Sequence, residues 1–94
     1  MVGAPGNENE MDAEVAAMVA ALKAAAEEKA GSTFATFVPL KYTTQVVAGT
    51  NFMVRVKTGE GECAHVKIYE PLPHTGQPPT LSSIVTGKTL DEPL

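Results

Sequence analysis

The sequence predicts an α+β domain in which a single α-helix packs across a four- to five-stranded antiparallel β-sheet. Two observations lead to this prediction. Apolar residues recur at helical spacing in the first part of the chain, and alternating apolar and polar residues, divided by Gly- and Pro-containing stretches, follow them. One helix followed by consecutive strands with short connections is typical of a helix lying across one face of an antiparallel sheet.

Chain length and composition indicate one domain over residues 1 to 94. Hydrophobic residues make up 44% of the chain and charged residues 19%, which is typical of a globular protein rather than a disordered one. The net charge is -4, and Lys and Arg form no cluster, so we expect no nucleic-acid partner. No run approaches the roughly 20 apolar residues of a membrane span, so we expect no membrane association.

Cysteine usage bears on the compartment. Cys63 is the only cysteine, so no internal disulfide can form, whereas small secreted domains usually depend on several. The N-terminal residues mix acidic and short side chains and lack the charged start and apolar run of a signal peptide. We therefore expect a cytoplasmic protein.

The helix is expected to follow a flexible arm. Residues 1 to 11 contain two glycines, a proline and short polar residues with no apolar period, which predicts a mobile N-terminal arm. Asp12 is a suitable N-cap and Gly31 a suitable terminator, so we expect one helix between them. Its apolar stripe consists of Val15, Met18, Val19, Leu22 and Ala26.

Four strands are expected after Gly31. The first is predicted from about Phe34 to Gln45, with a bulge or bend at Pro39, because proline removes one donor from the ladder. In the second, Phe52, Val54 and Val56 share one face. The third places Ala64, Val66 and Ile68 on one face, opposite Cys63, His65, Lys67 and Tyr69. The last begins near Thr80.

The connections between these strands have different compositions. We expect Gly59-Glu60-Gly61 to supply the positive φ angles of a tight hairpin turn. The loops at 46–48 and 72–77 occupy alternate turns of the meander, so both should emerge at one end of the sheet. The Gly59 turn should emerge at the other end.

The first of these loops is unusually apolar. Gln45-Val46-Val47-Ala48-Gly49 places two valines and an alanine where turns usually hold Asn, Asp, Gly or Ser. Valines presented to water at a loop tip are consistent with a surface kept for docking into another protein. The more common outcome for an arbitrary sequence is that such valines end the strand and fold back onto the core.

These residues also carry a resemblance to a known family. The run Gln45-Val46-Val47-Ala48-Gly49-Thr50-Asn51 is similar to the first-loop signature of the cystatins. Gly3, the helix end Glu27-Glu28-Lys29 and the second-loop run Leu72-Pro73-His74 extend the similarity over nearly the whole chain. The lack of a signal peptide and of disulfides resembles the stefin branch.

The resemblance implies a cystatin-like fold and tight, reversible, competitive inhibition of papain-like cysteine proteases of the cathepsin type. It implies a wedge of arm and two loops inserted into the protease groove, with no enzymatic activity, cofactor or metal. Gly3 would let the arm turn away before a carbonyl reaches the catalytic sulfur. Gln45 would support the first loop, and His74 would lie at the rim. The implied protease-binding residues are Val2, Gly3, Gln45, Val46, Val47, Ala48, Gly49, Leu72, Pro73 and His74.

The sequence departs from the stefin pattern in two places. The second loop contains Thr75-Gly76, and the chain closes with Asp91-Glu92-Pro93-Leu94, where stefins commonly have an aromatic residue. No contact from the C-terminal residues is therefore carried over from the family.

Other interpretations start from the same residues. Cys63 and His65 share a strand face, which suggests a cysteine nucleophile with a histidine base. No motif for an oxyanion site accompanies them. The simpler interpretation is a free thiol beside a solvent-facing histidine. Cys63, His65 and His74 match no zinc spacing. A non-inhibitory interaction module on the same scaffold is a further alternative. We expect a monomer, and strand exchange through Val47 would instead give a domain-swapped dimer.

Overall fold

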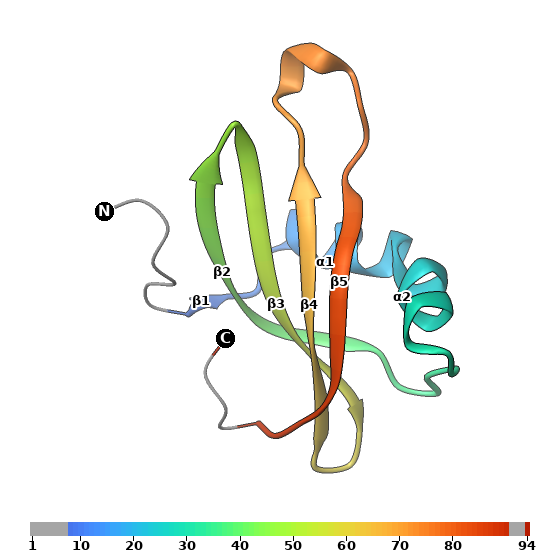
Figure 1. Ribbon diagram of the computed structural model, residues 1–94. Helices are drawn as coiled ribbons and strands as arrows, with labels where there is room; N and C mark the ends of the chain where they lie inside the picture. Colours follow the sequence, from blue (N-terminus) through green and yellow to red (C-terminus); the bar gives the residue numbers. More distant parts are fainter. Residues whose placement is uncertain (1–7, 91–93) are drawn as a thin grey trace.

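From the first helix onward, the elements follow the predicted order. The computed structural model describes residues 8–90 and Leu94, so Val2 and Gly3 lie outside the described residues. The elements are β1 (Asn9–Glu10), α1 (Ala13–Ala21), α2 (Lys23–Ala30), β2 (Val38–Val47), β3 (Gly49–Gly59), β4 (Glu62–Glu70), a 3-10 turn η1 (Pro73–Thr75) and β5 (Thr80–Lys88). The five strands form one antiparallel sheet in the order β1-β2-β3-β4-β5 (Figure 1). This confirms the α+β fold class.

The helix begins and ends where its caps were predicted, but Leu22 divides it. The Asp12 carboxylate accepts hydrogen bonds from the Val15 N–H at 2.8 Å and from the Tyr42 hydroxyl at 2.8 Å. Leu22 departs from helical geometry with φ -99° and ψ 7°, so α1 and α2 replace one uniform helix. Its N–H still bonds to the Met18 carbonyl at 3.1 Å and its carbonyl accepts from the Ala26 N–H at 2.9 Å, so hydrogen bonding continues through the division. Gly31, at φ 73°, ends α2 in the left-handed conformation.

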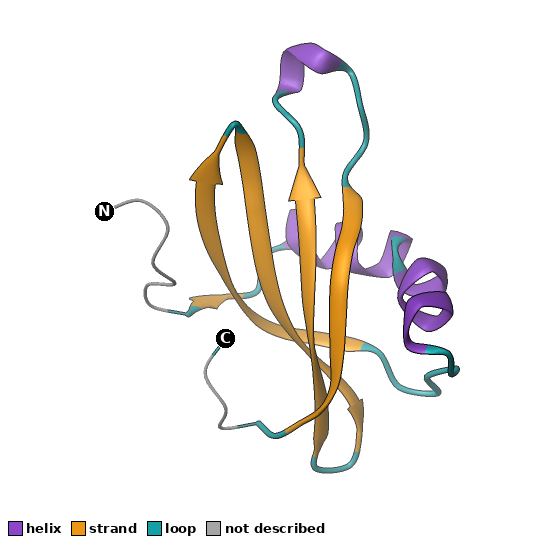
Figure 2. Ribbon diagram, in the orientation of Figure 1, coloured by secondary structure: helices purple, strands orange, loops and turns teal. Residues whose placement is uncertain are grey.

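The core lies between the helices and one face of the sheet. Both helices cross the same side of the sheet, with α2 nearest β5 (Figure 2). The buried cluster consists of Val15, Val19, Val54, Val56, Ala64, Val66 and Ile68. These are residues that the helical stripe and the strand alternation assigned to the interior. Burial of each valine or isoleucine side chain stabilises the fold by about 1.5–3 kcal/mol relative to its exposure to water.

The bounds predicted for the first strand after the helix need correction. The first strand begins at Val38 and ends at Val47, rather than running from Phe34 to Gln45. Phe34 stacks on Phe37 at a ring distance of 5.5 Å and donates its N–H to the Glu27 carboxylate at 2.7 Å, so this segment links the helix to the sheet. The register shift after Pro39 confirms the predicted bulge.

The turn between β3 and β4 was also only partly predicted. Gly61 has φ 71°, but Gly59 has no positive φ and pairs with Glu62 at the end of the ladder. The turn is therefore shorter than the predicted three residues, with Glu60 and Gly61 between the strands.

The face of the sheet opposite the helices differs most from the prediction. His65, expected to face solvent, is buried, as are Cys63, Thr43 and Arg55. The Arg55 guanidinium makes two bonds to the Glu8 carboxylate, at 2.5 and 2.7 Å. An ion pair between residues 47 positions apart leaves no periodic trace in the sequence, so pattern analysis could not find it.

The predicted arm over residues 1 to 11 is wrong for Asn9 and Glu10. These two residues form β1 and pair with Tyr42 and Lys41 of β2. The pairing uses backbone groups, which no apolar period reveals. Residues 1–7, where the arm prediction also falls, lie outside the described residues.

The Glu8–Arg55 pair predicts how stability depends on pH. The hydrogen bond from Arg55 is the main cause that holds the pKa of Glu8 below its usual value of 4.5. A lowered pKa in the folded state means that the pair stabilises the fold above the unfolded-state pKa and loses this contribution as pH falls through the folded-state pKa. We expect Glu8→Gln to lower the free energy of unfolding by about 1–2 kcal/mol at neutral pH. In urea denaturation the gap to wild type should shrink below pH 4.5. A gap that stays constant from pH 7 to pH 3 would contradict this expectation.

Candidate functional site

Two connections project from the same end of the sheet. The tip between β2 and β3 and the longer connection between β4 and β5 lie together at the top of Figure 1, and the turn between β3 and β4 lies at the opposite end. The alternation of strand direction dictates this placement, because every second turn of an antiparallel meander returns to the same end. The predicted positions of the three connections are confirmed.

The first tip presents apolar side chains to water. Val46 pairs with Thr50 and Val47 with Gly49, which leaves Ala48 alone at the apex. Val46 is 65% exposed and Val47 43% exposed, and Ala48 is exposed as well. The alternative in which the valines fold back onto the core is therefore wrong. Because neighbouring residues of a strand point to opposite faces, the tip is a thin ridge that is apolar on both sides.

Gly49 and Tyr69 hold this tip in place. Gly49 has φ 121°, and a Cβ at this position would lie 2.6 Å from the Glu70 carbonyl and 2.8 Å from the Tyr69 hydroxyl. The Tyr69 hydroxyl donates a hydrogen bond to the Ala48 carbonyl. The neighbouring strand β4 therefore braces the tip through Tyr69, and only a glycine at position 49 can pack so closely against that strand. The sequence did not reveal this role of Tyr69, because the alternation along its strand indicates only the face on which the side chain lies.

The second connection is closed by a threonine. Its turn η1 is stabilised by the Thr75 N–H and hydroxyl, which bond to the Leu72 carbonyl at 3.0 and 2.8 Å. Leu72 and His74 are exposed, and Gly76 has φ 70°. Thr75 and Gly76, which depart from the stefin pattern, thus shape this turn. Pro73 begins η1.

The structure brings together part of the predicted site. The residues from Gln45 to Gly49 and those from Leu72 to His74 lie at one end of the sheet. Gln45, half-buried, pairs in register with Asn51 just below the tip. Val2 and Gly3 lie outside the described residues, and the first described residue that leads toward them is Glu8.

The alternative chemical sites find no support. Burial raises the pKa of the Cys63 thiol, which opposes formation of the thiolate that a nucleophile needs. Cys63 is the second residue of β4 whereas His74 follows the far end of that strand, so the two cannot share a metal. Over residues 8–90 and 94, no three His, Cys, Asp or Glu side chains are placed to hold a metal ion. Within the same ranges, none of the helices has the length and apolar character needed to span a membrane.

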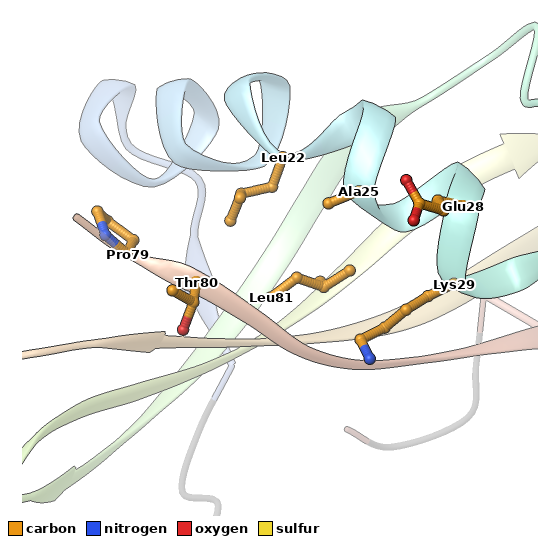
Figure 3. Close-up of a pocket in the computed structure, with 7 residues that line it drawn as sticks. All are labelled: Leu22, Ala25, Glu28, Lys29, Pro79, Thr80 and Leu81. Atoms are coloured by element: carbon orange, nitrogen blue, oxygen red, sulfur yellow. The ribbon is translucent and has the colours of Figure 1, made fainter.

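A separate hollow lies between the helices and β5. It has a volume of about 460 Å³, and Leu22 and Ala25 from the helical side face Pro79 and Leu81 across it (Figure 3). A second hollow of about 480 Å³ shares Leu22 and Pro79 with it. Neither is lined by residues 45–49 or 72–74.

Comparison with known proteins agrees with this architecture. Residues 3–91 match the family described as Cystatin domain. The chain is 36% identical to Cystatin-B of Sus scrofa over 94 residues, which cover 100% of this chain and 96% of that protein. It is 36% identical to Cystatin-B of Mus musculus over 88 residues, covering 94% and 90% of the two chains. Stefin-C of Bos taurus is 35% identical over 82 residues, covering 87% and 81%.

The fold is that of a small domain with two helices across an antiparallel sheet, and it exposes Val46, Val47 and Leu72 on two connections at one end of the sheet. The chain belongs to the cystatin family of cysteine protease inhibitors and is of the stefin type. Members of this family are inhibitors rather than enzymes.

The close contact at Gly49 gives a first test of the site. We expect Gly49→Ala to destabilise the fold by about 2–3 kcal/mol and to displace the tip, because the new Cβ would clash with backbone and would sit at an unfavourable φ. Gly61→Ala is the matched control, since Gly61 also has a positive φ but nothing lies within 4 Å of its added Cβ. The control should lose only about 1 kcal/mol. Equal losses in urea denaturation would mean that Tyr69 and Glu70 do not constrain the tip.

Proposed function

We propose that this protein is a tight, reversible, competitive inhibitor of papain-like cysteine proteases of the cathepsin type. The observation that carries the proposal is the exposure of Val46, Val47 and Leu72 on two connections at one end of the sheet. Contact of these apolar side chains with water is unfavourable in free energy. Docking into an apolar groove would remove them from water and recover that free energy. Membership of the cystatin family supports the same activity.

The first tip is suited to enter a narrow groove. Val46 and Val47 would contact opposite walls, because they project from the two faces of the same ridge. The Tyr69 hydroxyl and the backbone pairing hold the ridge before binding, so little conformational entropy is lost on docking. Leu72, Pro73 and His74 would contact the surface beside it, and Val2 and Gly3 would occupy the substrate side. Together these contacts would form an interface of standard size, about 1,600 Å².

Inhibition rather than cleavage follows from how the tip would meet the catalytic thiol. A hairpin apex paired on both sides cannot straighten to the extended conformation of a bound substrate without breaking its ladder. The groove would be blocked while no peptide bond is presented for attack. We further propose that the protein acts as a monomer in the cytoplasm, as its stefin-type resemblance implies.

Replacing a valine of the tip tests this function. We expect Val47→Asp to weaken inhibition of papain by roughly a hundredfold or more, because docking would bury an unpaired carboxylate. Val38→Asp is the control, since Val38 is similarly exposed at 48% but lies near the opposite end of the sheet, paired with Lys57. The inhibition constants should be measured with each folded variant. Full inhibition by Val47→Asp, or an equal loss for Val38→Asp, would rule out the assigned site.

Oligomeric state separates inhibition from the alternative of a non-inhibitory interaction module. Strand exchange at the first tip would join β2 and β3 into one continuous strand and remove the apex at Ala48. We expect the monomer fraction from gel filtration to inhibit papain and any domain-swapped dimer to be inactive. An active swapped dimer would contradict the proposed mechanism, and an inactive wild-type monomer would favour the interaction module.

A further inference from the structure

Glu8 is joined to the centre of the sheet by an ion pair of good geometry. Two oxygens of its carboxylate meet two nitrogens of the Arg55 guanidinium, at 2.5 and 2.7 Å. Arg55 belongs to the inner strand β3, and its side chain is 6% exposed, against 28% for Glu8. A bidentate pair fixes orientation as well as distance, so it defines where the chain before Glu8 leaves the body.

The other contacts that hold this segment are weaker. β1 has two residues at the edge of the sheet, paired with Tyr42 and Lys41. The Lys41–Glu10 ion pair, at 3.1 Å, lies between exposed side chains. Exposed pairs contribute little, and very short terminal strands fray readily. Loss of the Glu8–Arg55 pair would therefore leave Met11, which packs against the core cluster, as the next firm attachment, followed by Asp12 with its bonds to Val15 and Tyr42.

We propose that Glu8 and Arg55 are positioning residues for the N-terminal arm, which they hold so that Val2 and Gly3 reach the protease together with the two tips. This inference rests on the proposed inhibitory function. Neither residue contacts the protease in this scheme, and both act through the length and direction of the segment that precedes Glu8.

Chain length gives the size of the effect. Five positions separate Gly3 from Glu8, and eight separate it from Met11. The effective concentration of a tethered group falls as roughly the -3/2 power of tether length, which predicts a loss of about twofold on moving the attachment to Met11. The loss of direction adds to this figure, so we expect a weakening of at least about twofold.

The experiment compares Glu8→Gln with Glu10→Gln in the full chain. Both substitutions remove one carboxylate from the same segment, but only the first breaks the buried pair. We expect Glu8→Gln to raise the inhibition constant for papain at least about twofold and Glu10→Gln to leave it unchanged. In a Gly3→Arg background, where the arm no longer fits the groove, Glu8→Gln should cause no further loss. An equal loss in both backgrounds would show a general structural effect and overturn the positioning role.

A measurement without protease keeps the two proposals distinguishable. In the free protein, Glu8→Gln should lower the ¹⁵N heteronuclear NOE of the Asn9 and Glu10 amides and leave the amides of β3 unchanged. Unchanged values at Asn9 and Glu10 would overturn the anchoring even if the wild type inhibits papain. Suppose instead that these NOE values fall on Glu8→Gln but the wild-type protein does not inhibit papain. That result would confirm that Glu8 anchors the segment, and it would overturn both the proposed inhibitory function and the positioning role of Glu8 and Arg55 in inhibition.

Discussion

The register of the antiparallel sheet is the constraint on which the rest of this structure depends. A shift of one residue would turn Val54, Val66 and their neighbours away from the helices, so burial of that face holds every strand in one alignment. The same alignment brings the β2–β3 tip and the β4–β5 connection to one end. Packing beneath Val15 and Val19 therefore determines the geometry of a surface far from them.

Register also explains how an apolar tip can remain rigid in water. Val47 pairs with Gly49, and the absence of a Cβ at Gly49 lets Tyr69 reach the Ala48 carbonyl. The tip is thus held by the ladder below it and by the neighbouring strand, without the polar turn residues that usually stabilise a hairpin. A tip held in this way is organised before it meets a partner, and this favours binding more than additional contact area would.

The three parts of the proposed inhibitory surface are held by different physical means. Backbone ladders and turn hydrogen bonds position the two tips, whereas the strongest contact of the first described residues before the helix is the ion pair from Glu8 to Arg55. In this proposal the face of the sheet opposite the helices takes part in inhibition. Arg55 and His65 are buried on that face, and the Glu8 carboxylate neutralises the charge of Arg55.

The sequence by itself determined the class of fold, the helix caps, the faces of the strands, and the placement and composition of the two connections. Each follows from interactions within one element or between consecutive elements, and these leave a period or a turn signal in the chain. Only the tertiary structure decided the division at Leu22, the short strand β1, the burial of His65, the brace from Tyr69 and the Glu8–Arg55 pair. These features arise from side-chain reach and backbone contact between distant positions, and such contacts exist only once the register has brought the partners together.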